Sequence, residues 1–413
     1  MLKGLRVVEL ATYVAAPAAG GLLADWGAEV IKVEPPGGDP MRKFFGSIGA
    51  DSHGNPVFEL DNRGKRALAV NTGTDEGARI VKDLARTADV LLTNVRLKSL
   101  KRSGLDYASL RAENPRLVYA IVTGYGLEGA DADRPGFDMA AFWSRSGLAR
   151  LFAPKGQDPI PLRTALGDHV TSLATVGGIL AALYERERTG RGRLVETSLL
   201  RTGIYAMGSD MAIQLRLGRV ASTRPREEAV NPLTNFFRTR DGHWINLIPR
   251  QGNVDFADFA KAAGHPEWVV DPRFADSRSR RQHGAELVAE IDAAFAEHDL
   301  VSWRERLDKA DLVWAPVQTL AEVAEDAQAV AAGAFYDVPH KDGALLRSPA
   351  SPVRFHNDPD AESVGAGGRF ADGPRGPSPD FGEHTRAVLE ELGYDGSTID
   401  RLAQGGIIAL GQS

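Results

Sequence analysis

The first 200 residues alternate short apolar runs with helical stretches, and this alternation constrains the fold more than any other feature of the chain. Apolar runs of strand length occur at 5–10, 30–34, 67–70, 89–93, 117–122 and 194–197. The spacing of apolar residues predicts helices at 15–26, 74–87 and 170–188. Strands and helices that alternate in this way form parallel crossover units, so the sequence predicts an α/β fold.

A parallel sheet also indicates where a ligand should bind. Ligands on such sheets usually lie beyond the carboxyl ends of the strands. The loops that follow Leu10, Glu34, Thr93 and Val122 are therefore the expected place for a binding site.

The pattern changes after about residue 220. Two apolar runs at 235–239 and 244–248 are joined by an Asp-Gly turn, which is typical of a β-hairpin. Helices are expected near 255–263, 284–297 and 300–309, which together with the hairpin indicate a smaller α+β domain. Residues 360–380 are rich in Gly, Pro, Asp and Ser and predict an irregular surface segment, and the last helix is expected at 383–392.

Composition excludes several classes of function. A net charge of −6 argues against a general nucleic-acid binder, because neutralising phosphates needs a basic surplus. The absence of cysteine removes disulfides, thiolate catalysis and cysteine-based zinc sites. The nine histidines show no metal-ligand spacing, and we find no P-loop, GxGxxG or GxSxG motif, so no metal is expected. No apolar run of about 18 residues and no secretory signal is seen, so we expect a cytoplasmic protein without a membrane span.

The segment Leu166-Gly167-Asp168-His169-Val170 precedes the longest predicted helix. Asp168 is expected to be the N-cap of that helix, where the helix dipole keeps a carboxylate ionised at neutral pH. Such a carboxylate can attack an activated carbonyl, and Gly167 would let a substrate approach it. His169 is either a general base or an ordinary structural histidine. The second reading is favoured because adjacent helical residues do not face each other.

A group of basic residues lies near the predicted strand ends. Either they form a solvated charged face, or they form a cradle for phosphate groups. They are Arg42, Lys43, Arg63, Lys65, Arg66, Arg96, Lys98, Lys101 and Arg102.

Several stretches together resemble the class III CoA-transferase family (CaiB/BaiF-like), which includes formyl-CoA and carnitine CoA-transferases. The matching blocks follow the family's order along essentially the whole chain, so the set is specific although each block alone is weak. They lie at 5–10, 16–17, 27–34, 62–66, 88–94, 114–118, 124–126, 167–168, 178–183, 189–192, 238–245 and 382–385.

The resemblance implies an architecture. Residues 1–200 would form a large Rossmann-like domain that binds CoA, 201–225 a linker and 226–320 the small α+β domain. Residues 321–413 would return to the large domain, and two chains would interlock as linked rings in a homodimer.

The resemblance also implies a mechanism in which Asp168 is the nucleophile. Its carboxylate attacks an acyl-CoA donor to give a mixed anhydride and CoA thiolate, and the thiolate then converts the anhydride into an aspartyl-CoA thioester. A carboxylic acid acceptor takes the CoA from that thioester. CoA and acyl-CoA are substrates in this scheme, and no permanently bound cofactor or metal is implied.

Matching to the family implies a set of CoA contacts. They are Val14, Ala15, Arg42, Val70, Asn71, Thr72, Gly73, Asn94, Val95, Arg96, Arg102, Phe137, Asp138 and Met139.

The chain departs from formyl-CoA transferases at two places. Pro35 stands where they have an arginine, so Arg42 is expected to serve the adenine end instead. Residues 248–252 replace their glycine-rich loop, and Arg250 there is either a contact for the acceptor carboxylate or a surface charge. Residues near the pocket that would select the acid are Trp143, Asn231, Phe236 and Phe237.

Two rival functions stay open. An α-methylacyl-CoA racemase or epimerase of the same fold needs a histidine near position 137 and an aspartate near 168, and Phe137 removes the first base. A non-catalytic acyl-CoA-binding relative is the other rival, and the intact Asp168 argues against it.

Overall fold

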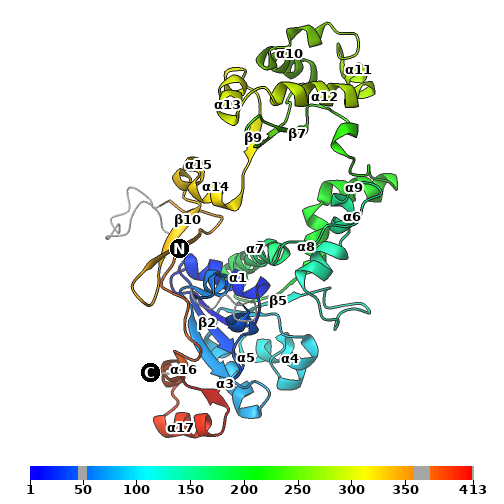
Figure 1. Ribbon diagram of the computed structural model, residues 1–413. Helices are drawn as coiled ribbons and strands as arrows, with labels where there is room; N and C mark the ends of the chain where they lie inside the picture. The colour runs from blue at the N-terminus through cyan, green and yellow to red at the C-terminus, as the bar shows by residue number, and fades with distance from the viewer. Residues whose placement is uncertain (45–53, 357–372, 412–413) are drawn as a thin grey trace. The chain divides into compact units, whose positions relative to one another are not determined.

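The computed structural model describes residues 1–44, 54–356 and 373–411 (Figure 1). It divides into two compact units. Unit 1 comprises 1–150, 160–220 and 333–413, and unit 2 comprises 151–159 and 221–332.

Unit 1 is built on a seven-stranded sheet in the order β12-β3-β2-β1-β4-β5-β6. Its strands are β1 (Arg6–Leu10), β2 (Glu29–Glu34), β3 (Arg66–Val70), β4 (Val90–Thr93), β5 (Val118–Thr123), β6 (Leu194–Ser198) and β12 (Ile408–Ala409). The first six are parallel, and β12 pairs antiparallel with β3. The predicted α/β fold is confirmed, and the order 3-2-1-4-5-6 places the switch point of the sheet between β1 and β4.

The other elements in this part of the chain are helices and one hairpin. They are α1 (Ala15–Asp25), α2 (Pro56–Asn62), α3 (Asp75–Thr87), α4 (Leu97–Ser103), α5 (Tyr107–Glu113), α6 (Leu148–Phe152), α7 (Leu166–Thr189), α8 (Leu199–Ala206), α9 (Gly208–Leu217), α16 (Thr385–Glu391), α17 (Gly396–Gln404), β10 (Phe335–Pro339) and β11 (Leu345–Pro349). Short turns of other helix types cover Pro40–Lys43, a 3₁₀ helix, and Met139–Ser144, a π-helix.

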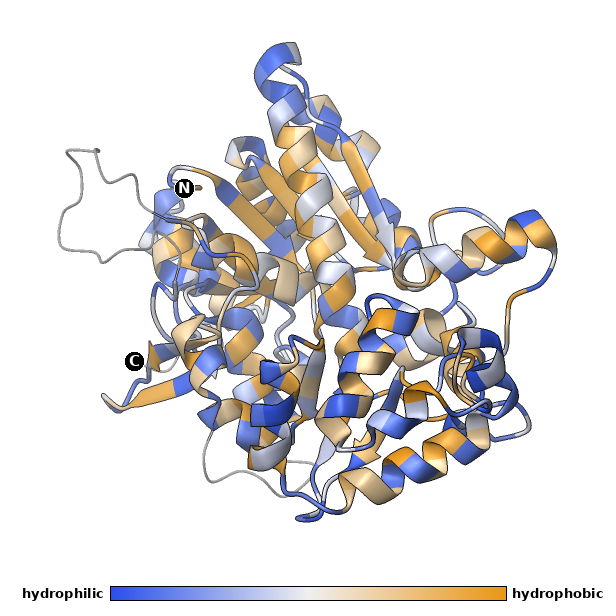
Figure 2. Ribbon diagram, turned by 90° about the horizontal axis from the view of Figure 1, so that it is seen from above, coloured by the Kyte–Doolittle hydropathy of each residue, from blue (hydrophilic) through white to orange (hydrophobic). Residues whose placement is uncertain are grey.

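Both faces of the parallel sheet are buried, as such sheets require. On one face Val8 and Ile31 pack with residues of α3, α5, α16 and α17. On the other face Val7 and Val30 pack with residues of α1 and α7. Strands that are buried on both sides read as continuous apolar runs, and Figure 2 shows them hydrophobic along most of their length.

Helix α7 is one continuous helix through Gly177 and Gly178. The helix packs closely at Gly178, where a Cβ would lie 2.7 Å from Val195 Cγ1. Helix α7 is long and apolar enough to cross a membrane by length and composition alone. It is nevertheless a core helix of the sheet domain, because Val176 and Ile179 are buried against α1 and the strands.

The chain continues past the helix that was expected to be the last. Helix α17 follows, with Ile399 and Leu402 buried, and β12 then pairs with β3 through Ile408 and Val70. The predicted irregular segment 360–380 lies outside the described residues up to 372, and 373–380 contains no helix or strand.

Unit 2 contains a three-stranded antiparallel sheet in the order β7-β8-β9, in which β7 and β8 form the predicted hairpin. Its elements are β7 (Asn235–Arg238), β8 (Trp244–Leu247), β9 (Trp314–Val317), α10 (Gly252–Ala263), α11 (Ser277–Gln282), α12 (Gly284–Phe295), α13 (Leu300–Lys309), α14 (Leu320–Glu325), α15 (Ala327–Ala331) and 3₁₀ turns at Arg226–Glu228 and Pro266–Val269.

The core of unit 2 is aromatic. Phe237 stacks on Phe295 with ring centroids 5.0 Å apart, and Phe295 stacks on Trp303 at 4.0 Å. Phe237 is fully buried in this stack, so the expectation that it lines an acid-selecting pocket was wrong. Its neighbour Phe236 points to the other face of the strand and is exposed.

Candidate active site

A cavity of about 500 Å³ lies beyond the carboxyl ends of β1, β4 and β5 in unit 1. Its lining comes from the loops after Leu10, Thr93 and Val122, as the parallel sheet predicted, whereas the loop directly after Glu34 is not among its lining residues. The described residues that line it are Thr12, Tyr13, Val14, Ala15, Asn94, Val95, Arg96, Leu97, Ser99, Val122, Thr123, Gly124, Leu127, Ala132, Asp133, Arg134, Pro135, Gly136, Phe137, Asp168 and Leu199.

The structure brings Asp168 into one cavity with part of the expected CoA contacts. The expected contacts that line this cavity are Val14, Ala15, Asn94, Val95, Arg96 and Phe137. A second cavity of about 190 Å³ is lined by Thr72, Gly73 and Arg102 and shares Val95 and Ser99 with the first. The expected contacts thus fall mainly on two adjoining cavities.

The other expected contacts lie elsewhere. Val70 is buried in the core of the sheet, and the Asn71 side chain accepts a hydrogen bond from the Gly73 N–H. Met139 is exposed and does not line either cavity. Asp138 is buried next to the start of α7.

Arg42 is held within the loop that follows β2. Its guanidinium contacts the Glu34 carboxylate at 2.6 and 2.7 Å, donates to the Pro379 carbonyl and lies over the ring of Phe58. The structure therefore places Arg42 outside the cavity that contains Asp168.

Hydrogen bonds fix the loops after β1 and β4 against each other. The Asn94 side chain accepts from the Thr12 N–H at 3.1 Å and donates to the Thr12 carbonyl at 2.6 Å. Tyr13 adopts a left-handed backbone conformation with φ 66°, which residues other than glycine rarely adopt. Its N–H donates to Asp39 at 3.1 Å, so Asp39 stabilises this conformation at the cavity wall.

Asp39 belongs to a buried cluster of charges. Lys32 contacts Asp39 at 2.8 Å and Glu9 at 3.2 Å, and Lys65 contacts Glu9 at 2.7 Å. Burial lowers the pKa of Lys65 to about 8. Burial also opposes the charge on Lys32, but Glu9 and Asp39 raise its pKa above the usual value. A side chain at Gly20 would meet Glu9, so this glycine is needed for the cluster to pack.

These contacts decide between the two readings of several basic residues. Lys65 and Arg63 are buried in ion pairs, Arg63 with Asp25 at 2.6 Å, and neither can form part of a phosphate cradle. Arg96 lines the first cavity and Arg102 the second.

Asp168 is the third residue of α7 and not its N-cap, which corrects the expectation from sequence. The N-cap is Ala165, in a left-handed conformation with φ 67°. Among the described residues we find no hydrogen bond or ion pair to the Asp168 carboxylate. The helix therefore starts earlier than predicted and presents Asp168 from its first turn.

The electrostatic setting of Asp168 also differs from the prediction. Burial, the Asp138 charge and the Asp61 charge raise the pKa of Asp168 to about 7, while His169 acts in the opposite direction. A carboxyl with this pKa is only partly ionised at neutral pH. The expectation that the carboxylate stays ionised at neutral pH took no account of Asp138 and Asp61, whose charges oppose its ionisation.

Asp138 is one of these carboxyls. Its Oδ1 accepts from the Met139 N–H at 2.7 Å, and its Oδ2 is buried without a hydrogen-bond partner among the described residues. Burial raises the pKa of Asp138, and the N–H groups of Met139, Gly167 and Ala165 partly offset this rise. Asp138 therefore lies against the start of α7.

Gly167 is required for the packing of the first turn of α7. A Cβ at this position would lie 2.6 Å from the ring of Phe142. Only glycine allows the first turn of α7 to lie against that ring.

His169 has a specific partner that sequence reasoning missed. Its Nε2 lies 3.1 Å from Oδ1 of Asp61, a residue of α2 that is only 3% exposed. The hydrogen bond to Asp61 raises the pKa of His169. No local sequence pattern marks this pair, because the two residues lie 108 positions apart.

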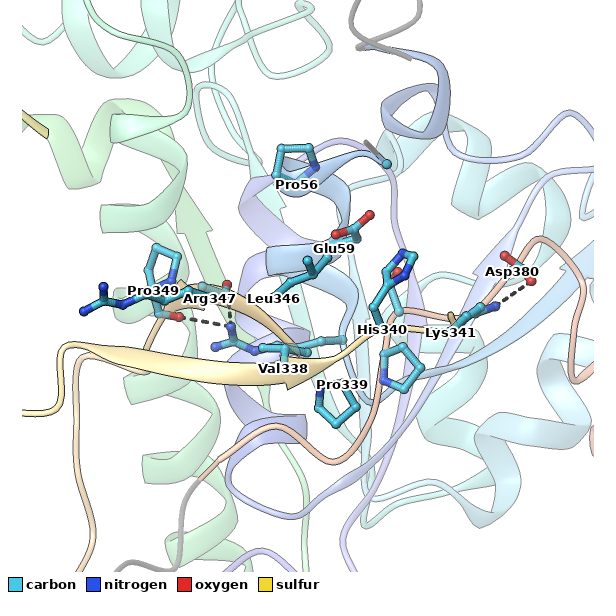
Figure 3. Close-up of a pocket in the computed structure, with 15 residues that line it drawn as sticks. Pro56, Glu59, Val338, Pro339, His340, Lys341, Leu346, Arg347, Pro349 and Asp380 are labelled. Atoms are coloured by element: carbon cyan, nitrogen blue, oxygen red, sulfur yellow. Dashed lines mark hydrogen bonds and ion pairs between the residues drawn. The ribbon is translucent and has the colours of Figure 1, made fainter. Parts of the chain in front are cut away.

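A third cavity lies apart from these two, between α2 and the β10–β11 hairpin (Figure 3). Three of its basic side chains are paired: Arg63 with Asp25, Lys341 with Asp380 at 2.5 Å, and His340 with Asp342 at 2.8 Å. A fourth, Arg347, lies over the ring of Phe335. The predicted nucleophile is not among the residues that line this cavity, so the cavity with Asp168 is the candidate active site.

Two further expectations concern metals and Arg250. Within 1–44, 54–356 and 373–411 the structure has no cluster of three or more His, Cys, Asp or Glu side chains able to hold a metal ion.

Arg250 lies in unit 2, where its guanidinium pairs with the carboxylate of Asp311 at 3.1 Å.

The chain is similar to proteins of known activity over its full length. It is 33% identical over 412 residues to (R)-2-hydroxy-4-methylpentanoate CoA-transferase of Clostridioides difficile, covering 99% of each chain. It is also 33% identical over 409 residues to cinnamoyl-CoA:phenyllactate CoA-transferase of Clostridium sporogenes, covering 97% of this chain and 96% of the other.

A solved structure has the same fold. The crystal structure of a CaiB/BaiF family protein from Brucella suis superposes with a TM-score of 0.81 at 29% identity, covering 95% of this chain and 99% of that one. The model of CoA-transferase family III matches residues 2–366. With Asp168 placed in a cavity at the switch side of the sheet, the chain belongs to CoA-transferase family III.

Proposed function

We propose that this protein moves CoA from an acyl-CoA donor to a carboxylic acid acceptor through covalent intermediates on Asp168. One observation supports this above all: the Asp168 carboxylate lines a cavity at the carboxyl ends of the strands and has no protein partner among the described residues. A carboxylate that lines a pocket and has no structural role of its own is available as a nucleophile.

The reaction proceeds in steps that keep the free energy of the thioester bond. Ionised Asp168 attacks the acyl carbon of the donor, which forms a mixed anhydride and releases CoA thiolate. The thiolate attacks the aspartyl carbonyl, so the donor acid leaves and an aspartyl-CoA thioester forms. The acceptor carboxylate attacks that thioester and gives a new anhydride and free thiolate. The thiolate then attacks the acyl carbon of the acceptor, which regenerates Asp168.

The two adjoining cavities suggest how CoA would lie. Val14, Ala15 and Phe137 would contact its thioester arm near Asp168, because they line the same cavity. Arg96 and Arg102 would meet its phosphate groups, since guanidinium groups pair well with phosphate oxygens.

In this proposal the active protein is a homodimer of interlocked chains. Helix α7 exposes an apolar stripe that includes Leu173, Ala174, Gly177, Ala181 and Tyr184, and none of the residues of α9 is buried. Such faces favour contact with another protein surface. Interlocked rings cannot exchange subunits without unfolding, so native dimers with and without an isotope label should stay unmixed for days. Rapid mixing, or a monomeric mass in solution, would contradict this arrangement.

The acceptor acid would be selected in part by Arg250. Its guanidinium is half-exposed and pairs with an exposed carboxylate, Asp311, which an acceptor carboxylate can replace. An Arg250→Ala variant should raise KM for the acceptor and leave KM for the donor unchanged. An unchanged acceptor KM would exclude the contact.

The test of the function is a transfer assay with a panel of acids. The panel contains 2-hydroxy acids, which the names of both curated relatives suggest, together with aryl-propenoic, dicarboxylic and carnitine-like acids. We expect a new CoA ester with at least one acceptor, and its loss in Asp168→Ala but not in the control Asp271→Ala, which changes a residue of unit 2. Exchange of the α-proton in deuterated water without transfer of CoA would favour a racemase. Binding of acyl-CoA without any reaction would favour a non-catalytic relative.

A further inference from the structure

The side chain of Asp61 is buried and has a single hydrogen-bond partner. Its Oδ1 lies 3.1 Å from His169 Nε2, and its Oδ2 has no hydrogen bond among the described residues. Lys65 is a buried cation on which the Asp61 charge also acts, but its ammonium group is hydrogen-bonded to Glu9, Asn62 and the Pro17 carbonyl. His169 is therefore the cationic partner that contacts Asp61 directly.

His169 in turn is surrounded by carboxyls. Three face it: Asp61 from α2, its neighbour Asp168 on α7, and Asp138 from the segment before the π-helix. All three raise the pKa of His169, with the Asp61 hydrogen bond leading, against the opposing effect of burial. Among the described charged groups that act on Asp168, His169 favours the ionised carboxylate, whereas Asp138 and Asp61 disfavour it.

We propose that Asp61 and His169 form an ion pair that holds a positive charge beside the Asp168 carboxylate, which makes both of them positioning residues for the nucleophile. This inference rests on the proposed function, because it assigns the pair to a reaction at Asp168. The proposal adds Asp61 of α2 and His169 of α7 to the active site, and no sequence pattern links these two residues.

A buried carboxylate enforces the charge on its partner. If His169 were neutral, Asp61 would be left as a buried anion without compensation, and this is strongly unfavourable. The His169 side chain is 41% exposed, so its ring can carry a proton at modest cost in hydration. The positive imidazolium then offsets the two carboxyls that push Asp168 toward its neutral, unreactive form.

The test is the pH dependence of acyl transfer onto the protein, followed as the first burst of donor acid released from an acyl-CoA. The variants are Asp61→Asn and His169→Gln, which keep the shape of the side chains and remove the pair. His169→Gln should move the midpoint of the profile upward by about one pH unit, so that the burst is about tenfold slower near pH 6 and close to wild type near pH 9. Asp61→Asn should move the midpoint upward by a smaller amount, because it also removes a carboxylate that disfavours the ionised form of Asp168. The double variant should shift no further than His169→Gln alone, because without His169 no imidazolium is left for Asp61 to hold.

A matched control is available in unit 2. His265 pairs with exposed Glu267 at 2.9 Å, so Glu267→Gln makes the same chemical change next to another histidine. This variant should keep the wild-type profile. If Asp61→Asn and His169→Gln slow the burst by the same factor at every pH, their role is merely structural and the proposal is overturned.

The outcome separates this proposal from the proposed function. If the wild-type protein shows no burst at any pH, Asp168 is not acylated and the function itself is rejected. A wild-type burst with unshifted variants rejects only the ion pair. If Asp61→Asn fails to fold, the profile of His169→Gln alone decides. The NMR titration of His169 in an Asp168→Asn background reports the charge on the imidazole without any turnover, and a pKa near 6.5 there would also overturn the proposal.

Discussion

The rings of Tyr13 and Phe137 meet edge to face at the wall of the cavity that contains Asp168, with centroids 5.3 Å apart and planes at 81°. Both residues are partly exposed, and Tyr13 is held in a left-handed backbone by Asp39. An aromatic pair of this geometry is preorganised to pack against an apolar part of a ligand.

Replacement of Phe137 should weaken CoA binding. We expect Phe137→Ala to raise Kd for CoA about tenfold, because the variant loses the ring contact and an apolar cavity wall. Phe152→Ala is a matched control, since Phe152 has the same exposed fraction of 57% and does not line the cavity. Calorimetric titration measures both constants. Equal constants for the two variants would show that the Tyr13–Phe137 wall does not contact CoA.

Removal of one buried charge should destabilise the sheet domain. In Lys65→Met, Glu9 loses its 2.7 Å partner inside a fully buried cluster, which should cost about 3–5 kcal/mol. The exposed pair Arg401–Glu76, at 2.9 Å, is the comparison, and Arg401→Met should cost less than about 1 kcal/mol. Thermal unfolding of both variants checks this, and similar melting temperatures would contradict the importance of the cluster.

Asp168 should lower the stability of the protein. Its pKa is raised to about 7 in the folded state, so the folded protein binds the proton more tightly than the unfolded chain. Stability is then lost as pH rises from about 4 to about 7 and stays low above that range. We expect Asp168→Asn to be more stable than wild type by about 1–3 kcal/mol at pH 8, with a smaller gain at pH 4.

The control for this gain is Asp271→Asn, because Arg273 holds the pKa of the Asp271 carboxyl below its usual range. That variant should lose a little stability at pH 8 instead of gaining it. Melting curves at the two pH values measure both effects. A gain for Asp168→Asn that is equal at pH 4 and pH 8 would show that proton binding is not its cause.

Asp138 should act on the pH profile in the direction opposite to His169. Its negative charge raises the pKa of Asp168, so Asp138→Asn should lower that pKa and move the burst profile to lower pH. The amide oxygen can still accept from the Met139 N–H, which keeps the local contact. Burst rates between pH 5 and pH 9 check the shift, and an upward shift would mean that Asp138 serves mainly to bind the substrate.

Most of the sheet in unit 1 could be predicted, because strands that are buried on both faces read as continuous apolar runs. The exceptions are informative. β12 has only two residues and pairs through Ile408 and Ala409, too short for any periodic pattern. The start of α7 was misplaced because Ala165 takes a left-handed N-cap conformation, for which alanine gives no signal.

The candidate site was predictable only at the level of single residues. Asp168 and the loops around it follow from the strand ends and from the family resemblance. The Asp61–His169 contact joins residues 108 positions apart, and no local pattern announces it. Lys65 was a candidate for phosphate binding because sequence cannot show that Glu9, on another strand, neutralises it in the core.

The central claim is that Asp168 carries the acyl group, and the most direct measurement is mass spectrometry of the protein after incubation with acyl-CoA donors and trapping with hydroxylamine or borohydride. The account predicts a modified peptide containing Asp168, formed in wild type and absent in Asp168→Ala. An unmodified Asp168 peptide in a wild-type sample that transfers CoA, or a label that persists in Asp168→Ala, would contradict it.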